Sequence, residues 1–391
     1  MLIHELATPC VLIEKSRLDS NLAAMAARAA DNDVQLRPHV KTHKSVVLAR
    51  MQLESGAKGI TVAKPSEAEV FAHAGISDIR IAYAASAEHH FEKIADLMDR
   101  SRVSFCIDTM EGAREASAFF NARGLTARVL IEVDCGDGRC GVVWDDRGSI
   151  DFVRSVSSLP GLQILGILTH AGHAYDGPGP DDASSHASVA RIADEERDRM
   201  LAFASILLNS GAVRIDRDHF EISIGSTPTM SAFHNVSRDG LRITEIRPGN
   251  YIFNDAIQSA LGVAPLRNCA LTVYSSIISK HPDPRGSHER VFLDAGRKIL
   301  TSDTGYGTDG YGVILHSAST MTPLPHAHLD KLSEEHGWVD VPGGSTLAVR
   351  DRVRIVPNHS CVVMNTQRVA HLVDGEHRIR EIAVDARGCV T

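Results

Sequence analysis

The stretch RPHVKTHK, at residues 37–44, is the most informative part of this sequence. Apolar and polar residues alternate from position 34 to position 41, which predicts a strand that ends where a helix begins. This period of two would place Arg37, His39 and Lys41 on one face of the strand. Burial and neighbouring cations lower the pKa of a lysine, and a lysine with a lowered pKa is a nucleophile. A solvated basic edge is the other interpretation of the same residues.

Beyond this stretch, strand-like and helix-like segments alternate through the N-terminal part of the chain. The strand-like segments are 34–41, 59–62, 78–82, 103–107, 127–133, 162–168, 219–223 and 241–246. Helices are predicted at 17–30, 66–74, 88–99, 109–121, 149–158 and 183–209. Interleaved helices indicate a parallel sheet, and eight strands indicate a closed (β/α)8 TIM barrel. An open doubly wound sheet is the alternative, but no glycine-rich dinucleotide loop follows the first strand.

After residue 255 the pattern changes to short segments rich in β-branched and aromatic residues, at 271–278, 290–293, 338–341 and 352–356. Gly, Pro, Asp and Asn separate these segments and few helix signals remain, which is typical of a mostly-β domain. A chain of 391 residues is also long enough for two domains. We therefore expect a barrel over residues 14–255 and a C-terminal mostly-β domain over residues 256–391, joined by residues 1–13.

The composition argues against several classes of protein. A formal net charge of -8 does not favour a nucleic-acid surface, and no apolar run approaches the roughly 20 residues that cross a membrane. Seven cysteines are scattered along the chain without a disulfide pattern, which favours reduced thiols. Residues 1–5 lack the basic start and apolar centre of a signal peptide. The sequence therefore predicts a cytoplasmic globular protein.

Polar residues gather where the predicted strands end, and the chemistry of a (β/α)8 barrel lies at these C-terminal ends. Gly225, Ser226 and Thr227 follow the seventh strand, while Gly249 and Asn250 follow the eighth. Barrels often bind phosphate with these two loops, although either loop alone is equally an ordinary turn. Two such loops opposite a lysine on the first strand predict a phosphorylated cofactor that reacts with an amine, namely pyridoxal 5′-phosphate.

The sequence resembles the alanine-racemase-like (fold type III) pyridoxal-phosphate enzymes, and within them the group of D-serine dehydratases and D-threonine aldolases. The resemblance extends over nearly the whole chain, and the joint occurrence of its motifs in one order is highly specific. The motifs are RPHVKTHK (37–44), EVDCGDGRCG (132–141), HAGHAY (170–175), SIGSTPT (223–229), TEIRPGNYIFND (244–255), LSEEHG (332–337) and PNHSC (357–361).

The resemblance implies a role for each matching position. Lys41 would form a Schiff base with the cofactor, His170 would lie against the cofactor ring, and Arg139 would lie near its phenolic oxygen. Arg247 occupies the position of the arginine that faces the pyridine nitrogen in alanine racemase. The other positions that would bind the cofactor, most of them in the phosphate site, are Tyr175, Gly225, Ser226, Thr227, Gly249 and Asn250.

A candidate metal site lies far along the chain, at His359 and Cys361. On a strand, residues i and i+2 share a face, and nitrogen plus sulfur ligands suit zinc. The resemblance implies that this pair matches the zinc ligands of the D-serine dehydratases. In the aldolases the matching position is usually aspartate, which suits manganese or magnesium better. Two ligands leave coordination positions open, as a catalytic metal requires, and residues 334–336 (EEH) are either supporting groups or a solvated acidic turn.

The lysine, the phosphate site and the metal pair together predict a dehydratase that depends on pyridoxal 5′-phosphate and zinc. It would eliminate the β-hydroxyl of a D-amino acid, such as D-serine, D-threonine or 3-hydroxy-D-aspartate, to give a 2-keto acid and ammonia. Metal-dependent cleavage of Cα–Cβ, as in D-threonine aldolase, is the first alternative. A racemase would leave the metal pair unexplained, and a cofactor carrier without activity would leave the second domain unexplained.

The side chain of the substrate stays open at this point. A β-carboxylate would need a cation near the metal, and the sequence offers Arg238, His281, Arg297 and Lys298 without placing any of them. Enzymes of this fold type are generally head-to-tail dimers in which the β domain completes the partner's site. The resemblance therefore implies a homodimer.

Overall fold

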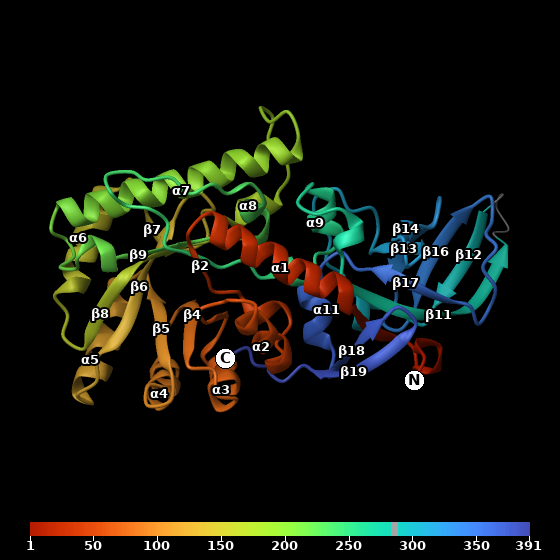
Figure 1. The fold of residues 1–391 in the computed structure, drawn as a ribbon, viewed down its shortest axis with the longest axis horizontal. Helices are drawn as coiled ribbons and strands as arrows, with labels where there is room; N and C mark the ends of the chain where they lie inside the picture. The colour runs from red at the N-terminus through yellow and green to blue at the C-terminus, as the bar shows by residue number, and fades with distance from the viewer. Residues whose placement is uncertain (283–287) are drawn as a thin grey trace.

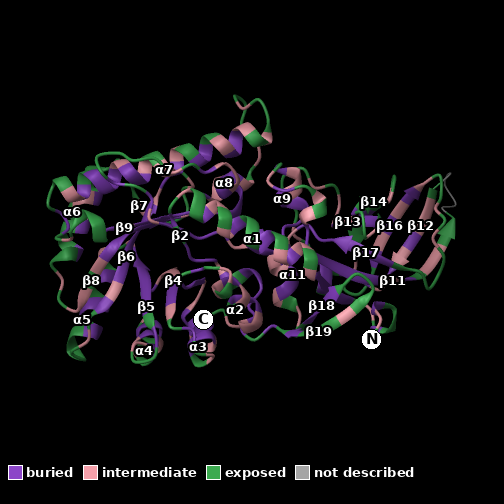
Figure 2. Cartoon of the chain, viewed as in Figure 1, coloured by how far each residue is buried: buried purple, intermediate pink, exposed green. Residues whose placement is uncertain are grey.

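Two sheets organise the molecule: parallel strands alternate with helices in one half, and mostly antiparallel strands form the other half (Figure 1). The computed structural model describes residues 1–282 and 288–391. The strands of the parallel sheet are largely buried, whereas several strands of the other sheet and the outward faces of the helices are exposed in part (Figure 2). One apolar cluster runs from Ile60 in the first half to Val273 in the second, so the two halves share a core.

The predicted (β/α)8 barrel is present. Its parallel strands follow one another in the order β2-β10-β9-β8-β6-β5-β4-β3. The two ends of this order meet, because His39 bridges Thr61 and the Thr61 N–H donates to the Pro38 carbonyl at 2.8 Å. The ring is therefore closed, which excludes an open doubly wound sheet. The strands are β2 (Gln35–Leu36), β3 (Ile60–Val62), β4 (Asp78–Ala84), β5 (Arg102–Ile107), β6 (Ala127–Asp134), β8 (Leu162–Thr169), β9 (Glu221–Ile224) and β10 (Glu245–Ile246).

Helices lie on the outside of the barrel, close to the predicted positions. They are α1 (Lys15–Asp31), α2 (Val46–Glu54), α3 (Pro65–His73), α4 (Glu88–Leu97), α5 (Met110–Ala122), α6 (Arg147–Ser157) and α7 (Ser185–Asn209). The sequence does not predict β7 (Val142–Val143), α8 (Thr227–Ala232) or α9 (Ala256–Ala260), because such short elements show no periodic pattern. None of the helices in the described residues is both long enough and apolar enough to cross a membrane.

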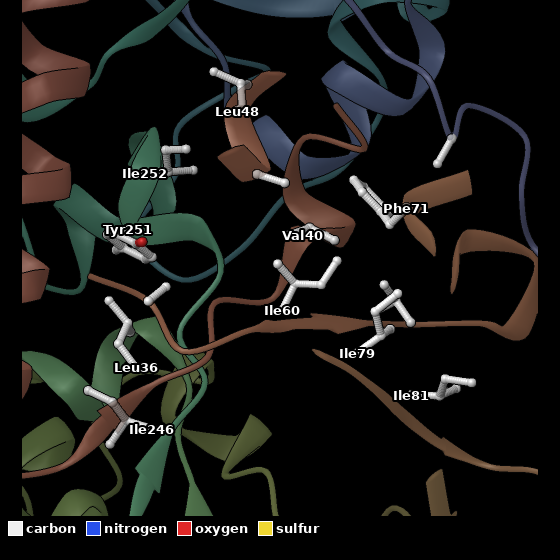
Figure 3. Packing of buried hydrophobic residues seen from close by; sticks show 14 of the residues in the cluster. Leu36, Val40, Leu48, Ile60, Phe71, Ile79, Ile81, Ile246, Tyr251 and Ile252 are labelled. Carbon is white, nitrogen blue, oxygen red and sulfur yellow. The ribbon is translucent and has the colours of Figure 1, made fainter. Parts of the chain in front are cut away.

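The first strand is shorter than the sequence predicts. β2 is followed by extended chain and then by a 3₁₀ turn, η2 (Val40–Thr42). Lys41 therefore does not share a strand face with Arg37, and that prediction is wrong. Val40 is fully buried and packs into the apolar cluster near Ile60 (Figure 3). Successive residues of a 3₁₀ turn point about 120° apart, so a buried Val40 turns Lys41 away from the core.

A buried ion network lies inside the barrel. Glu245 accepts a hydrogen bond from Arg37 Nε at 2.6 Å and also pairs with Arg80. Arg37 is paired in addition with Asp78, at 2.6 Å. Burial alone would raise the pKa of the Glu245 carboxyl, but Arg37 and Arg80 lower it to about 2. Arg37 is thus neutralised by carboxylates and is not a free cation beside Lys41.

Replacing Glu245 with glutamine should reduce the free energy of unfolding by about 3–5 kcal/mol, because Arg37 and Arg80 would stay buried without this carboxylate. Urea unfolding measures the loss. An exposed pair provides the control: Asp33→Asn, which breaks the contact with Arg242, should cost less than about 1 kcal/mol. Similar losses in the two variants would contradict a stabilising role for the buried network.

The lowered pKa of Glu245 also makes the free energy of unfolding depend on pH. The pKa of Glu245 in the folded protein lies below its ordinary value of 4.5. The stabilisation is therefore fully present above about pH 4.5 and is lost as the pH falls toward about 2. The Glu245→Gln variant should lack this part of the acid dependence.

The second sheet contains the N-terminal strand as well as the C-terminal part of the chain. β1 (Cys10–Glu14) runs antiparallel to β11 (Leu271–Pro282) and parallel to β18 (Val369–Asp374). The segments predicted as strands lie in β11, β12 (His288–Leu293), β16 (Gly337–Pro342) and β17 (Arg352–Val356). The remaining elements are β13 (Val313–Ser317), β14 (Thr322–Pro323), β15 (His328–Leu332), β19 (His377–Ala383), α10 (Arg297–Leu300) and α11 (Ser360–Thr366).

Candidate active site

A cavity of about 1130 Å³ opens at the C-terminal ends of the barrel strands. The second domain contributes α11 and residues 304–306 to its wall, so both halves of the molecule enclose it. All the residues that the sequence predicts for cofactor and metal binding line this one cavity: Lys41, Arg139, His170, Tyr175, Gly225, Ser226, Thr227, Arg247, Gly249, Asn250, His359 and Cys361.

Lys41 projects from the turn after β2 into the cavity. Its side chain is open to the cavity, although protein surrounds the position on every side. Burial lowers the pKa of its amine, the nearby Cys361 offsets part of this effect, and Arg139 lowers the pKa further. A lowered lysine pKa is therefore present as expected, but burial and Arg139 cause it rather than Arg37. The free amine is available at a lower pH than that of an ordinary lysine.

His170 presents a neutral imidazole at the end of β8. Its Nδ1 lies 3.3 Å from the Gly225 carbonyl, which only accepts hydrogen bonds, so Nδ1 carries the proton. Burial lowers the pKa of His170 to about 3, and Lys41 and Arg139 lower it as well. A neutral, oriented ring at this position suits a flat aromatic partner. Arg139 is held less firmly, because its side chain is 56% exposed and lies 3.8 Å from Glu132.

Arg247 has a buried donor that no described residue satisfies. Its Nη1 donates to the Ser223 hydroxyl at 2.6 Å and its Nη2 to the Thr169 carbonyl. Its Nε has no hydrogen-bond partner among the described residues, although the side chain is buried and lines the cavity. Burial lowers the pKa of Arg247 to about 10, which leaves it charged at neutral pH. An acceptor in the cavity, such as a ring nitrogen, would satisfy this N–H group.

The two glycine loops after β9 and β10 pack too closely to accept a side chain. A Cβ at Gly249 would lie 2.8 Å from both the His39 carbonyl and Thr42 Oγ1. Gly225 has a φ of +121°, in the region that favours glycine. Between these loops, the Gln258 amide is fully buried, and neither of its polar atoms has a hydrogen-bond partner within the described chain. Unpaired buried amides are costly, so a polar ligand in the cavity is the expected partner of Gln258.

These residues fit pyridoxal 5′-phosphate. The cavity offers an amine, a neutral imidazole, a buried N–H donor at Arg247, and hydroxyl and amide groups around two glycine loops. The set matches the aldehyde, the ring, the ring nitrogen and the phosphate of that cofactor. The sequence did not predict two residues of this region. Gln258 lines the cavity, and Glu196 on α7 lies behind the lining, where it accepts a hydrogen bond from the Gly225 N–H at 3.0 Å and supports the loop.

His359 and Cys361 come together in a different way from the one predicted. They do not lie on a strand, because His359 begins α11 and Cys361 lies in its first turn. Cys361 Sγ lies 3.3 Å from Thr42 Oγ1, which places the pair next to Lys41. His359 Nδ1 lies 2.8 Å from Asp303 Oδ2, so the other ring nitrogen is left for a ligand.

The charges around His359 also favour a cation. Burial would lower the pKa of this imidazole, but Cys361, Asp255 and Asp303 raise it to about 10. Nitrogen and sulfur donors in a negative environment fit zinc, and softer ligands of this kind are less suited to manganese or magnesium. The chemistry of the donor set therefore fits the predicted metal.

Asp255 connects the phosphate loop with the metal pair. This carboxylate is fully buried and accepts hydrogen bonds from Asn250 Nδ2 at 2.5 Å and from the Ser360 N–H at 3.0 Å. Its other oxygen accepts from the Gln258 N–H at 3.0 Å and so begins α9. Ser360 lies between His359 and Cys361, so Asp255 holds α11 of the second domain against the barrel. The residue belongs to the TEIRPGNYIFND motif, but its role depends on a contact between distant segments.

Other residues that the sequence put forward lie away from the cavity. Glu334 and Glu335 pair with the exposed Lys298 at 3.0 and 2.6 Å, which makes residues 334–336 a solvated acidic turn rather than support for the metal. Among the described residues, none of the cations proposed for a β-carboxylate lines the cavity: Arg238, His281, Arg297 and Lys298. Asp303 carried no signal in the sequence, since nothing near residue 303 connects it with residue 359.

Comparisons with known proteins agree with this arrangement. The model of the alanine racemase N-terminal domain matches residues 13–256, and that of a putative serine dehydratase domain matches residues 270–373. D-threo-3-hydroxyaspartate dehydratase of Delftia sp. (strain HT23) is 32% identical, over 91% of this chain and 91% of the relative. D-threonine aldolase of Arthrobacter sp. is 31% identical, over 90% of this chain and 85% of that protein.

Solved structures are similar over nearly the full length. Two are mutants of D-threo-3-hydroxyaspartate dehydratase: one has a histidine replaced with alanine, and the other has a cysteine two positions later replaced with alanine and is in the metal-free form. The histidine mutant has a TM-score of 0.86 and 29% identity, and the match covers 98% of this chain and 96% of that chain. The cysteine mutant has a TM-score of 0.85 and 28% identity, and the match covers 98% of both chains. The chain therefore belongs to the alanine-racemase-like, fold type III family, in the group that joins this barrel to a serine dehydratase domain.

Proposed function

We propose that the protein is a dehydratase that eliminates the β-hydroxyl of a β-hydroxy-D-amino acid and yields a 2-keto acid and ammonia. The observation that carries this proposal is the position of His359 and Cys361 beside Lys41, in one cavity with two glycine loops. The relatives named above as a D-threo-3-hydroxyaspartate dehydratase and a D-threonine aldolase support a lyase acting on such substrates.

Pyridoxal 5′-phosphate is the cofactor that the family implies, and Zn²⁺ is the metal that we propose. When bound, the cofactor supplies an electron sink for the charge that develops at Cα. A metal at His359 and Cys361 supplies Lewis-acid chemistry toward a hydroxyl. The spacing of these two residues equals that of the histidine and cysteine replaced in the two mutant structures, of which the cysteine mutant is metal-free.

The chain's own residues divide the remaining work. Lys41 Nζ would hold the cofactor through its aldehyde, and once the substrate amine has displaced it, the free amine with its lowered pKa would take the proton from Cα of the substrate. His170, which stays neutral, would orient the ring, and Arg247 Nε would be the donor for the ring nitrogen. The phosphate is held by the residues of the two loops and by neighbouring side chains: Tyr175, Gly225, Ser226, Thr227, Gly249, Asn250 and Gln258.

Cleavage of Cα–Cβ is the second candidate, because one relative is a D-threonine aldolase. Such a cleavage needs a base for the hydroxyl proton and is associated, in the aldolases that the sequence resembles, with aspartate at the position of Cys361. The thiolate therefore favours elimination. A racemase or a carrier protein would have no use for the metal pair.

A panel of D- and L-β-hydroxy amino acids tests the proposal, with ammonia, keto acid and aldehyde measured with and without a chelator. Elimination predicts ammonia and keto acid in equal amounts from D-substrates only, and their loss on chelation. Aldehyde and glycine as products would replace the proposal with the aldolase. Turnover unchanged by complete removal of the metal would contradict the role of His359 and Cys361.

The assembly and location are parts of the same proposal. We expect a head-to-tail homodimer, in which the second domain of one subunit contacts the cavity of the other. All seven cysteines are free, in keeping with a reducing compartment such as the cytoplasm. A molar mass near twice 42.3 kDa in light scattering would support the dimer.

Replacing Asp303 with alanine should weaken the affinity for Zn²⁺ about 10- to 100-fold, because His359 would lose the carboxylate that fixes its ring. Zinc titration of the apo-protein measures this. Activity should return at high zinc concentration, since both ligands remain. An Asp309→Ala variant is the matched control, because Asp309 contacts the exposed His328 instead. Equal zinc affinities in the two variants would show that Asp303 does not position His359.

A further inference from the structure

Lys64 is a cavity cation that has no carboxylate partner among the described residues. It lies between β3 and α3 and lines the cavity. Lys44 is 3.0 Å from Glu67, and Arg139 is 3.8 Å from Glu132. The Lys64 ammonium forms no salt bridge and no hydrogen bond within residues 1–282 and 288–391, and it lies 3.6 Å from the centroid of the Tyr83 ring.

The barrel places Lys64 beside the reactive lysine and away from the phosphate loops. The parallel bridge between His39 and Thr61 fixes the register of the first two strands. Thr42 and Lys64 each follow their bridge residue by the same number of positions, so they lie at about the same height in the barrel. Neighbouring strands are about 4.8 Å apart. The phosphate loops follow β9 and β10, whereas Lys64 and Tyr83 follow or end β3 and β4, on the other side of β2. Lys64 therefore faces the part of the cavity that the phosphate does not occupy.

Aromatic side chains hold the Lys64 ammonium in place. Its position over the Tyr83 ring is that of a cation–π contact, which limits where the flexible side chain can move. Tyr83 is in turn fixed by the buried His90, whose ring meets it edge-on with centroids 5.5 Å apart. Burial lowers the pKa of His90, so this neighbour remains neutral at neutral pH and does not compete for an anion. The Lys64–Tyr83 pair is thus an oriented positive group without a counter-ion in the described part of the chain.

We propose that Lys64 binds a carboxylate of the amino-acid substrate, and that Tyr83 orients it for this task. The inference rests on the proposed function, since it identifies how the same cavity recognises its substrate. A carboxylate is the anion that every amino acid brings, and an unpaired ammonium near the reactive lysine is its natural partner. Substrates with one and with two carboxylates show whether the group bound is the one on Cα or the one on Cβ.

Steady-state kinetics of Lys64→Met with D-serine and 3-hydroxy-D-aspartate tests this inference. We expect kcat/KM to fall about 10- to 100-fold, mainly through a higher KM, because a charge-assisted contact to the bound substrate is lost. A loss with both substrates identifies the Cα carboxylate, and a loss only with 3-hydroxy-D-aspartate identifies the Cβ carboxylate. Lys64→Arg keeps the charge and should retain most of the affinity.

Lys93→Met is the matched control, because it removes a nearby lysine that pairs with Glu69 at 2.6 Å outside the cavity. If Lys64→Met and Lys93→Met behave alike with both substrates, the inference is overturned. A second measurement is independent of turnover: binding of D-malate, an unreactive dicarboxylate, should stabilise the wild type in thermal unfolding more than Lys64→Met. Absence of turnover in the wild type would refute the proposed function alone, whereas equal stabilisation by D-malate would refute the role of Lys64.

Discussion

Replacing Lys41 with alanine is expected to abolish the dehydratase activity and the covalent attachment of the cofactor, while leaving the fold intact. Lys41 projects into the cavity from a turn that is held by the buried Val40, and its amine makes no hydrogen bond to the described protein that the variant would lose. Loss of a positioned base alone costs about 10²- to 10⁴-fold in rate. The loss of attachment adds to this, because Lys41 serves in both roles.

Two measurements separate these roles. Borohydride reduction followed by peptide mass analysis should find the cofactor on the peptide containing Lys41 in the wild type, and on none in the variant. Added methylamine should restore part of the lost rate, since a small amine can enter the cavity that the side chain leaves. The exposed Lys58 provides the control, and Lys58→Ala should keep both attachment and rate. Cofactor found on another lysine of the wild type would refute the assignment.

Replacing Cys361 with alanine is the second change with a large expected effect. It should abolish zinc binding and reduce elimination at least about 100-fold, because Lewis-acid assistance to the leaving hydroxyl is worth several kcal/mol. Attachment of the cofactor to Lys41 should survive, since the hydrogen bond of Cys361 is to Thr42 and not to the phosphate loops. Metal analysis, visible absorbance and ammonia release measure the three quantities independently.

A second group of donors makes the choice of control important. Donor atoms of Asp108, Glu132 and Cys140 lie within 4.8 Å of one another, close to the same cavity. If this cluster held the metal, Cys140→Ala would lose zinc and Cys361→Ala would not. We expect the reverse, because His359 and Cys361 offer nitrogen and sulfur donors that suit zinc, whereas two of the three donors in the other cluster are carboxylates. Combining His359→Ala with Cys361→Ala should cost little more than either change alone, as expected for ligands of one ion.

Much of the fold was predictable because alternation is a local property. Strands such as β5 and β6, and helices such as α5 with its Thr109 cap, follow from residues that are neighbours in the sequence. The position at which the first strand ends could not be predicted from neighbouring residues. The alternation continues to Lys41, but the burial of Val40 against Ile60 ends the strand earlier. A periodic pattern says which side chains alternate, and packing decides where the pattern stops.

The sequence by itself determined the closed barrel, the second β domain and the motif residues of the cavity wall, because periodic patterns and motifs are properties of the chain. Tertiary structure alone decided how these residues act together. Asp255 joins the phosphate loop to α11, Asp303 orients His359, and Lys64 rests on Tyr83 beside RPHVKTHK. The cause of the lowered pKa of Lys41 is likewise tertiary. Burial and charge depend on which distant segments meet in space, and no local pattern records those meetings.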